Sequence, residues 1–299
     1  MADHNQTPSR LWVREGLKSG WDVTWTTAGR VAVSDSETNT VTLWNISGEE
    51  ICNSKSQGVE LSSPSGISYH RTWHGGCIVV VEVGKCTVRA LHPDTLQLLD
   101  SVNLQDQCRY LSGITTMYTG DIVVCGGIRM SSFHHRAIEG VVVLTMSGSS
   151  SSYQKAGARV IVTGPESVWS VKHKWRLPTD KSPRYIISTS DDHLLISVRG
   201  AHTVYKTTVR GTIVWQTDLS ITPYPCGISQ HKNTSSILLC CSDGSSGDHI
   251  RVVTSASNLL QRHLLPPPGF TWGNSLKSVS CHDNHLAVLH MSKLELWSQ

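Results

Sequence analysis

Long apolar runs are missing from this sequence of 299 residues. No apolar stretch reaches the ~18 residues that a membrane-spanning helix needs. The first ten residues are polar, unlike the apolar core of a secretory signal. We therefore expect a soluble, unsecreted protein with no membrane partner.

A strong charge of either sign is also missing. Lys and Arg together number 26 and Asp and Glu 23, a surplus too small to indicate nucleic-acid binding by net charge alone. The nine cysteines contain no CxxC pair followed by a second pair at zinc spacing, and their odd number fits reduced thiols better than a disulfide framework. These features predict a cytoplasmic protein in which any basic surface is local.

Common catalytic and metal-binding motifs are missing as well. The sequence contains neither GxSxG nor HExxH, and its 15 histidines are scattered. The acid-rich segments at Asp191 and Asp243 lack the ligand spacing of a calcium loop and fit turns better. We therefore predict a non-enzymatic protein with no catalytic residue, no metal and no cofactor.

The sequence does contain an internal repeat. Its clearest unit starts at Trp21 and reads WDVTWTTAGRVAVSDSETNTVTLWNISGEEI, which is three short strands separated by polar turns. Similar openings recur, with apolar anchors at Val23, Ile67, Ile114, Val171, Ile228 and Val279. The steps between anchors are 44, 47, 57, 57 and 51 residues, close to the length of a four-stranded propeller blade. The sequence therefore predicts an all-β protein folded as a six-bladed β-propeller.

The predicted propeller is one domain over residues 1–299, with a strand from the N-terminus closing the ring. We place the blades at residues 15–58, 59–105, 106–162, 163–220, 221–270 and 271–299. The last blade has only three strands of its own, which leaves an edge that would invite aggregation. Residues 9–14 are predicted to be a strand, so we expect them to complete the last blade.

The first repeat resembles an NHL repeat. A V-A-V-S-D strand ends at Asp35, and Asn39 precedes T-V-T-L, which places both residues at positions typical of that family. Later blades keep the Gly-Ile opening and the strand rhythm. The chain thus resembles the C-terminal propellers of tripartite-motif proteins, which implies recognition of a protein or of RNA. It has no RING or B-box spacing, so it cannot itself carry ubiquitin-ligase chemistry.

Two surfaces are candidates for binding. Loops between second and third strands and between blades share one face, where cations and aromatic groups could bind RNA or protein. We assign to it Lys85, Arg109, Tyr110, Arg129, His135, Arg136, Arg199, His202 and Trp272. The opposite face combines tryptophan with arginine, the composition of a protein-binding hot spot. We assign to it Arg71, Trp73, Lys174, Trp175 and Arg176.

Three functional hypotheses follow from the sequence. The leading one is a non-enzymatic recognition propeller that binds a protein or peptide, as the substrate-recognition part of a tripartite-motif ubiquitin-ligase system. The alternative is a single-stranded RNA-binding domain of the NHL type. The third is a hydrolase with a metal in the central channel, although no ring of inward carboxylates recurs at matching blade positions.

Overall fold

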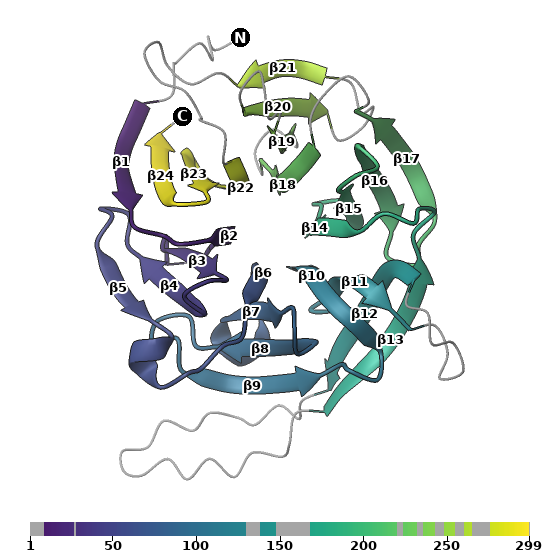
Figure 1. The fold of residues 1–299 in the computed structure, drawn as a ribbon, viewed down its shortest axis with the longest axis horizontal. Helices are drawn as coiled ribbons and strands as arrows, with labels where there is room; N and C mark the ends of the chain where they lie inside the picture. The colour runs from purple at the N-terminus through teal and green to yellow at the C-terminus, as the bar shows by residue number, and fades with distance from the viewer. Residues whose placement is uncertain are drawn as a thin grey trace.

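The fold is a ring of six antiparallel sheets of four strands each (Figure 1). It is seen in a computed structural model that describes residues 9–26, 28–129, 138–147, 168–219, 224–231, 236–242, 248–254, 260–264 and 276–298. The six-bladed all-β propeller predicted from the repeat is therefore confirmed.

The first three blades follow one another along the chain. The first contains β2 (Gly20–Trp25), β3 (Val31–Asp35), β4 (Thr40–Trp44) and β5 (Glu50–Asn53). The second contains β6 (Pro64–His70), β7 (Cys77–Glu82), β8 (Thr87–Leu91) and β9 (Leu98–Asn103). The third contains β10 (Cys108–Thr116), β11 (Ile122–Ile128), β12 (Ile138–Ser147) and β13 (Val168–Arg176). Two 3-10 helices, η1 (Lys55–Gln57) and η2 (Trp73–Gly75), lie in connecting loops.

The remaining blades complete the ring. The fourth contains β14 (Pro183–Ser188), β15 (His193–Val198), β16 (Thr203–Thr208) and β17 (Ile213–Asp218). The fifth contains β18 (Tyr224–Gln230), β19 (Ser236–Ser242), β20 (His249–Thr254) and β21 (Leu260–Leu264). The sixth contains β22 (Leu276–His282), β23 (His285–His290), β24 (Lys293–Ser298) and, from the other end of the chain, β1 (Ser9–Glu15).

The closing strand lies where the sequence predicts it. β1 pairs antiparallel with β24, in a register that joins Ser9 to Ser298 and Glu15 to Lys293. The outer edge of β24 is therefore covered, and the first and last strands of the chain belong to one sheet.

The fourth blade does not begin where the sequence predicts. The segment after Trp169 was expected to open it, but β13 pairs with β12 as the outer strand of the third blade, with Trp175 opposite Val141. The true opening is β14, in which Ile186 takes the anchor position and faces Ile196 of β15. The prediction failed because about twenty residues separate β12 from β13, so this outer strand looks like the start of a new repeat.

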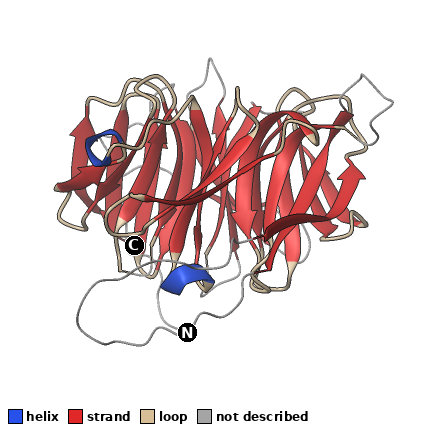
Figure 2. Cartoon of the chain, turned by 90° about the horizontal axis from the view of Figure 1, so that it is seen from below, coloured by secondary structure: helices blue, strands red, loops and turns tan. Residues whose placement is uncertain are grey.

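The two faces of the ring are defined by the direction of the inner strands. We call the face at which β2, β6, β10, β14, β18 and β22 begin the entry face, and the face at which they end the exit face. Figure 2 shows the ring edge-on, with strands running between the two faces. Turns from first to second strands, including η2, lie on the exit face, and turns from second to third strands lie on the entry face.

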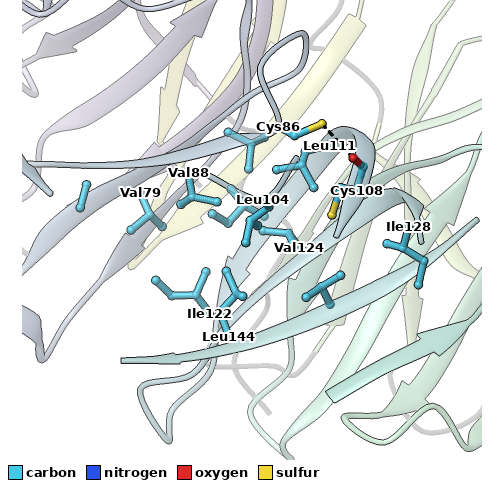
Figure 3. Packing of buried hydrophobic residues seen from close by; sticks show 14 of the residues in the cluster. Val79, Cys86, Val88, Leu104, Cys108, Leu111, Ile122, Val124, Ile128 and Leu144 are labelled. Carbon is cyan, nitrogen blue, oxygen red and sulfur yellow. Dashed lines mark hydrogen bonds between the residues drawn. The ribbon is translucent and has the colours of Figure 1, made fainter. Parts of the chain in front are cut away.

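Apolar side chains fill the space between neighbouring sheets. Between the second and third blades, Val79 and Val88 pack with Ile122, Val124 and Leu144, all almost fully buried (Figure 3). Burial of each such side chain stabilises the fold by about 1.5–3 kcal/mol. The cysteines in this layer, Cys77, Cys86 and Cys108, are free thiols.

The Gly-Ile openings have a steric cause. A Cβ at Gly66 would lie 2.7 Å from the Cα of Gly113 in the next inner strand, and one at Gly227 would lie 2.4 Å from the Cα of Ser278. The inner strands approach each other too closely for a side chain there.

Among the described helices, none has the length and apolar character needed to cross a membrane.

Candidate active site

A cavity of about 880 Å³ opens on the exit face at the centre of the ring. All six inner strands contribute to its wall through their C-terminal halves, together with the turns that follow β6, β10 and β14. Each blade therefore offers side chains to one central space, although they lie far apart in the sequence.

Two contacts across the channel form the base of this cavity. The hydroxyl of Tyr185, in the fourth blade, donates a 2.7 Å hydrogen bond to the carbonyl oxygen of Trp21, in the first blade on the opposite side of the ring. The adjacent Arg184 places its guanidinium carbon 4.3 Å from the centre of the Trp21 ring. Burial raises the pKa of Tyr185 well above 10, which keeps the hydroxyl protonated as a donor.

Asp22 is the carboxylate at the base of the cavity. Its Oδ1 accepts hydrogen bonds from the Val23 amide at 2.9 Å and from the Ser278 hydroxyl at 2.6 Å, while Oδ2 accepts the Ile67 amide at 3.1 Å. Burial raises the pKa of Asp22 from 3.8 to about 6, although these three hydrogen bonds act in the opposite direction. A carboxyl group that titrates near neutral pH inside a cavity is suited to acid–base catalysis.

Three uncommitted hydroxyl groups lie on the same side of the cavity as Asp22. Thr24, Ser68 and Ser280 come from the adjacent strands β2, β6 and β22, line the cavity and are half-buried. None has a side-chain hydrogen bond to another described residue. They can therefore donate to, or accept from, a bound polar molecule.

The histidine at the end of β6 is held in a structural role. His70 contacts the carbonyl oxygen of Gly120 through Nε2 at 2.9 Å and accepts the Trp73 amide on Nδ1 at 3.2 Å. These contacts place the proton on Nε2. Burial lowers the pKa of His70, so its ring stays neutral at pH 7.

A second histidine lies at the rim. His282 stacks on Trp25, with ring centres 5.4 Å apart and planes inclined by 23°, and its Nε2 is 3.5 Å from Asp283 Oδ2. Trp25 is fixed in turn, because its Nε1 donates to the Ser280 carbonyl oxygen at 3.0 Å. The aromatic side chain of Tyr118 also borders the cavity and is 90% exposed.

No metal-binding cluster occurs in the part of the chain that the structure describes: no group of three or more His, Cys, Asp or Glu side chains is close enough there to hold an ion. The hypothesis of a metal-dependent hydrolase thus lacks a ligand set among these residues.

The first predicted binding surface is assembled in part on the entry face. Lys85, Arg129, Arg199 and His202 follow second strands, while Arg109 and Tyr110 begin β10. The hydroxyl of Tyr110 is engaged by Glu139 and Ser182, so it serves in packing between blades. The other predicted members, His135, Arg136 and Trp272, lie outside the described residues. A partner for this surface stays a prediction.

The second predicted surface is divided by the structure. Arg71 and Trp73 lie on the exit face, but Lys174 lies near the entry face, where its ammonium contacts Gln107 Oε1 at 2.9 Å and the Arg129 carbonyl oxygen at 2.8 Å.

Trp175 and Arg176 follow Lys174 on β13 and lie at the same end of that strand. Trp175 is 9% exposed and donates its Nε1 proton to Val209 O at 3.1 Å. The grouping on one face was wrong because β13 is an outer strand and not an inner one. Trp175 is a packing residue.

Asp22 and Tyr185 were missed in the sequence. One signal was available: the residue before the anchor is glycine or serine in most openings but aspartate in the first. Tyr185 was missed because the opening of its blade was placed at the Val171 anchor, so that β14 was not recognised as an inner strand.

Comparison with known proteins relates the fold to propeller enzymes. A scan of protein-family models gave no match, and neither did a search of curated proteins. Virginiamycin B lyase from Staphylococcus aureus is similar in structure, with a TM-score of 0.60, 13% identity and coverage of 96% of this chain and 98% of that chain. A gluconolactonase from Xanthomonas campestris is also similar in structure, with a TM-score of 0.62, 13% identity and coverage of 97% of this chain and 88% of that chain.

A protein of unknown function from Bacteroides thetaiotaomicron has a TM-score of 0.67 at 10% identity, with 99% of this chain and 72% of that chain covered. At such low identity these likenesses establish the fold. The chain is thus a six-bladed propeller with structural neighbours among lactonases and lyases.

The functional prediction made from the sequence is contradicted by these neighbours. We expected a non-enzymatic recognition module, but the similar structures include a lyase and a gluconolactonase. The error arose because common catalytic motifs are local in sequence, whereas a propeller assembles its central cavity from one or two residues of each blade.

Proposed function

We propose that this propeller is an enzyme that cleaves a small, uncharged ester or lactone bound in the exit-face cavity, with Asp22 as general base. The observation that carries the proposal is the Asp22 carboxyl at the base of the cavity, whose pKa of about 6 leaves it ionised at neutral pH yet basic enough to accept a proton. The lactonase and lyase among the structural neighbours support an enzyme of this general class.

The proposed step uses groups that are already in place. Oδ2 of Asp22 accepts a single hydrogen bond among those described, from Ile67, and so keeps a lone pair for a water molecule. As Asp22 takes a proton from that water, the resulting hydroxide attacks the ester carbonyl. Collapse of the tetrahedral intermediate breaks the ester C–O bond and expels an alkoxide, which takes the proton held by Asp22 and leaves as the alcohol. The hydroxyls of Thr24, Ser68 and Ser280 would orient the substrate.

Activity of the purified chain on a panel of small esters and lactones, followed by proton release, tests this proposal. We expect Asp22→Asn to lower kcat/KM at least 100-fold, in the range usual for loss of a general base. The matched control is Asp94→Asn, because Asp94 is an exposed carboxylate that pairs with Arg30 outside the cavity. Equal activity of the wild type and Asp22→Asn would overturn the role of Asp22, and inactivity of the wild type on the whole panel would count against this reaction class.

The pH profile gives a second readout that loss of folding cannot imitate. The Ser278 hydroxyl lowers the pKa of Asp22, so Ser278→Ala should move the acidic limb of the kcat/KM profile to higher pH while activity on the plateau is kept. An unchanged limb would mean that Asp22 is not the group that titrates.

We also infer a cytoplasmic location, because the nine cysteines are free and most are buried, as expected in a reducing compartment. We also propose that the first blade is related to NHL repeats, on the basis of the positions of Asp35 and Asn39.

A further inference from the structure

The entry-face mouth of the channel holds a cation that no described carboxylate neutralises. Arg184 is half-buried and lies over the ring of Trp21 at 4.3 Å. No side-chain hydrogen bond or ion pair to another described residue accompanies that ring contact. Burial lowers the pKa of Arg184, and the positive charge of Arg199 lowers it further. The guanidinium therefore keeps hydrogen-bond donors for another group.

Two more cations, Arg199 and Lys277, lie at the same end of the channel. Arg199 directly follows β15, and its amide donates to the Ser182 carbonyl oxygen at 3.1 Å, beside the start of β14. Arg184 is the second residue of β14 and Lys277 is the second residue of β22, and β18 lies between these strands at the centre of the ring. Cys226 of β18 reports their approach. Burial raises its pKa and the negative charge of Asp248 adds to the rise, while the positive charges of Lys277, Arg199 and Arg184 oppose it.

Two acidic groups lie nearby. Asp248 is 6% exposed: its Oδ2 accepts the Leu276 amide, and its Oδ1 is buried without a hydrogen-bond partner among the described residues. Glu139 is bonded to Tyr110. Among the described residues, neither carboxylate pairs with Arg184 or Lys277. Like charges held close together repel one another, so the mouth attracts a small anion.

We infer that the entry-face mouth binds an oxyanion, either the phosphate or the carboxylate of a small molecule, between Arg184, Arg199 and Lys277. The guanidinium fork of Arg184 fits two oxygens of such a group, and its stacking on Trp21 fixes the plane of the fork. The site is separated from the exit-face cavity by the Tyr185–Trp21 hydrogen bond. It is thus independent of the proposed catalytic site.

Isothermal titration of the whole chain with inorganic phosphate, and separately with citrate, tests the inference at constant ionic strength. Arg184→Gln and Lys277→Gln each remove one charge from the mouth. Lys55→Gln is the matched control, because Lys55 is an exposed cation in η1 that reaches the same face outside the mouth. We expect at least one anion to bind the wild type. Each mouth variant should bind it about tenfold more weakly, as for loss of a charge-assisted hydrogen bond. The control variant should bind it as tightly as the wild type does.

The outcomes separate the alternatives. Stronger binding of phosphate than of citrate, or the reverse, identifies which oxyanion the mouth prefers. Lys277→Gln leaves the Arg184–Trp21 contact intact, so it tests the site even where Arg184→Gln fails to fold. No heat of binding with either anion, or equal affinity in wild type and Lys277→Gln, overturns the inference. Neither result depends on ester cleavage.

Discussion

Tyr185 of the fourth blade and Trp21 of the first blade meet across the centre of the ring, where the tyrosine hydroxyl donates to the tryptophan carbonyl oxygen at 2.7 Å. The two residues are 164 positions apart in the sequence. Their contact, with Arg184 stacked on Trp21, divides the central channel into a deep cavity on the exit face and a basic mouth on the entry face. The two ends can therefore bind different ligands.

Tyr185→Phe should destabilise the propeller by about 1–3 kcal/mol, because the Trp21 carbonyl oxygen loses a buried hydrogen-bond donor. Urea denaturation measures the change. The control is Tyr205→Phe: Tyr205 is 5% exposed, and its hydroxyl has no hydrogen bond to another described residue. Equal losses in both variants would show that the cross-channel bond adds nothing.

Gly66→Ala should cost about 1–3 kcal/mol through overpacking. The new Cβ would meet the Cα of Gly113 at 2.7 Å and the nitrogen of Ile114 at 2.8 Å, and a backbone cannot move aside as a flexible side chain can. In contrast, a Cβ at Gly84 has nothing within 4 Å, so Gly84→Ala should leave the thermal midpoint nearly unchanged. Similar midpoints for the two variants would disprove the close approach of the inner strands.

The repeat was readable from the sequence because it follows from local chemistry. The Gly-Ile openings mark inner strands that pack backbone to backbone, as at Gly66, and the missing strand of the last blade pointed to β1. The fourth blade was misread because β13 carries the alternating apolar pattern of an inner strand. Pairing partners, which sequence periodicity does not contain, decide between the two.

The candidate site was not readable in the same way. Asp22 acquires its raised pKa from burial, which outweighs the opposing hydrogen bonds from Ile67 and Ser278 in two other blades. Likewise, Trp175 carries the composition of a binding residue but is buried by its strand position. In both cases the property belongs to the three-dimensional neighbourhood, which single-sequence patterns do not specify.

Glu295 should stabilise the last blade near neutral pH. It is 2% exposed and receives the Lys293 ammonium at 2.6 Å and the Trp297 Nε1 proton at 3.0 Å. Burial alone would raise the pKa of Glu295, but the neighbouring His290 and Lys293 lower it by more than burial raises it. The net effect brings the pKa from 4.5 down to about 2. The stabilisation is thus present above pH 4.5 and is lost as the pH falls toward 2.

Glu295→Gln tests this charge directly. We expect it to reduce the free energy of unfolding by up to about 3 kcal/mol at pH 7, and by progressively less as the pH falls below 4.5. The measurement is urea denaturation at a series of pH values. A deficit that is the same at pH 7 and at pH 3 would show that the charge of Glu295 is not what matters.

Asp22 should have the opposite effect on stability. Its pKa is about 6 in the folded chain against 3.8 for the free group, so between these values the folded state holds a proton that the unfolded chain has lost. The unfolding free energy therefore falls as the pH rises from about 4 to 6, by about 3 kcal/mol from this group alone. Asp22→Asn removes the titration, so the stability of the variant relative to wild type should improve by that amount between pH 4 and pH 7.

Comparing two pH values separates this effect from any packing cost of the amide, because a packing cost is the same at both. Asp94→Asn, which changes an exposed carboxylate, should show no comparable trend. If the difference between wild type and Asp22→Asn does not change with pH, Asp22 titrates as it would in water. The general base proposed for ester cleavage would then lack the raised pKa on which that proposal rests.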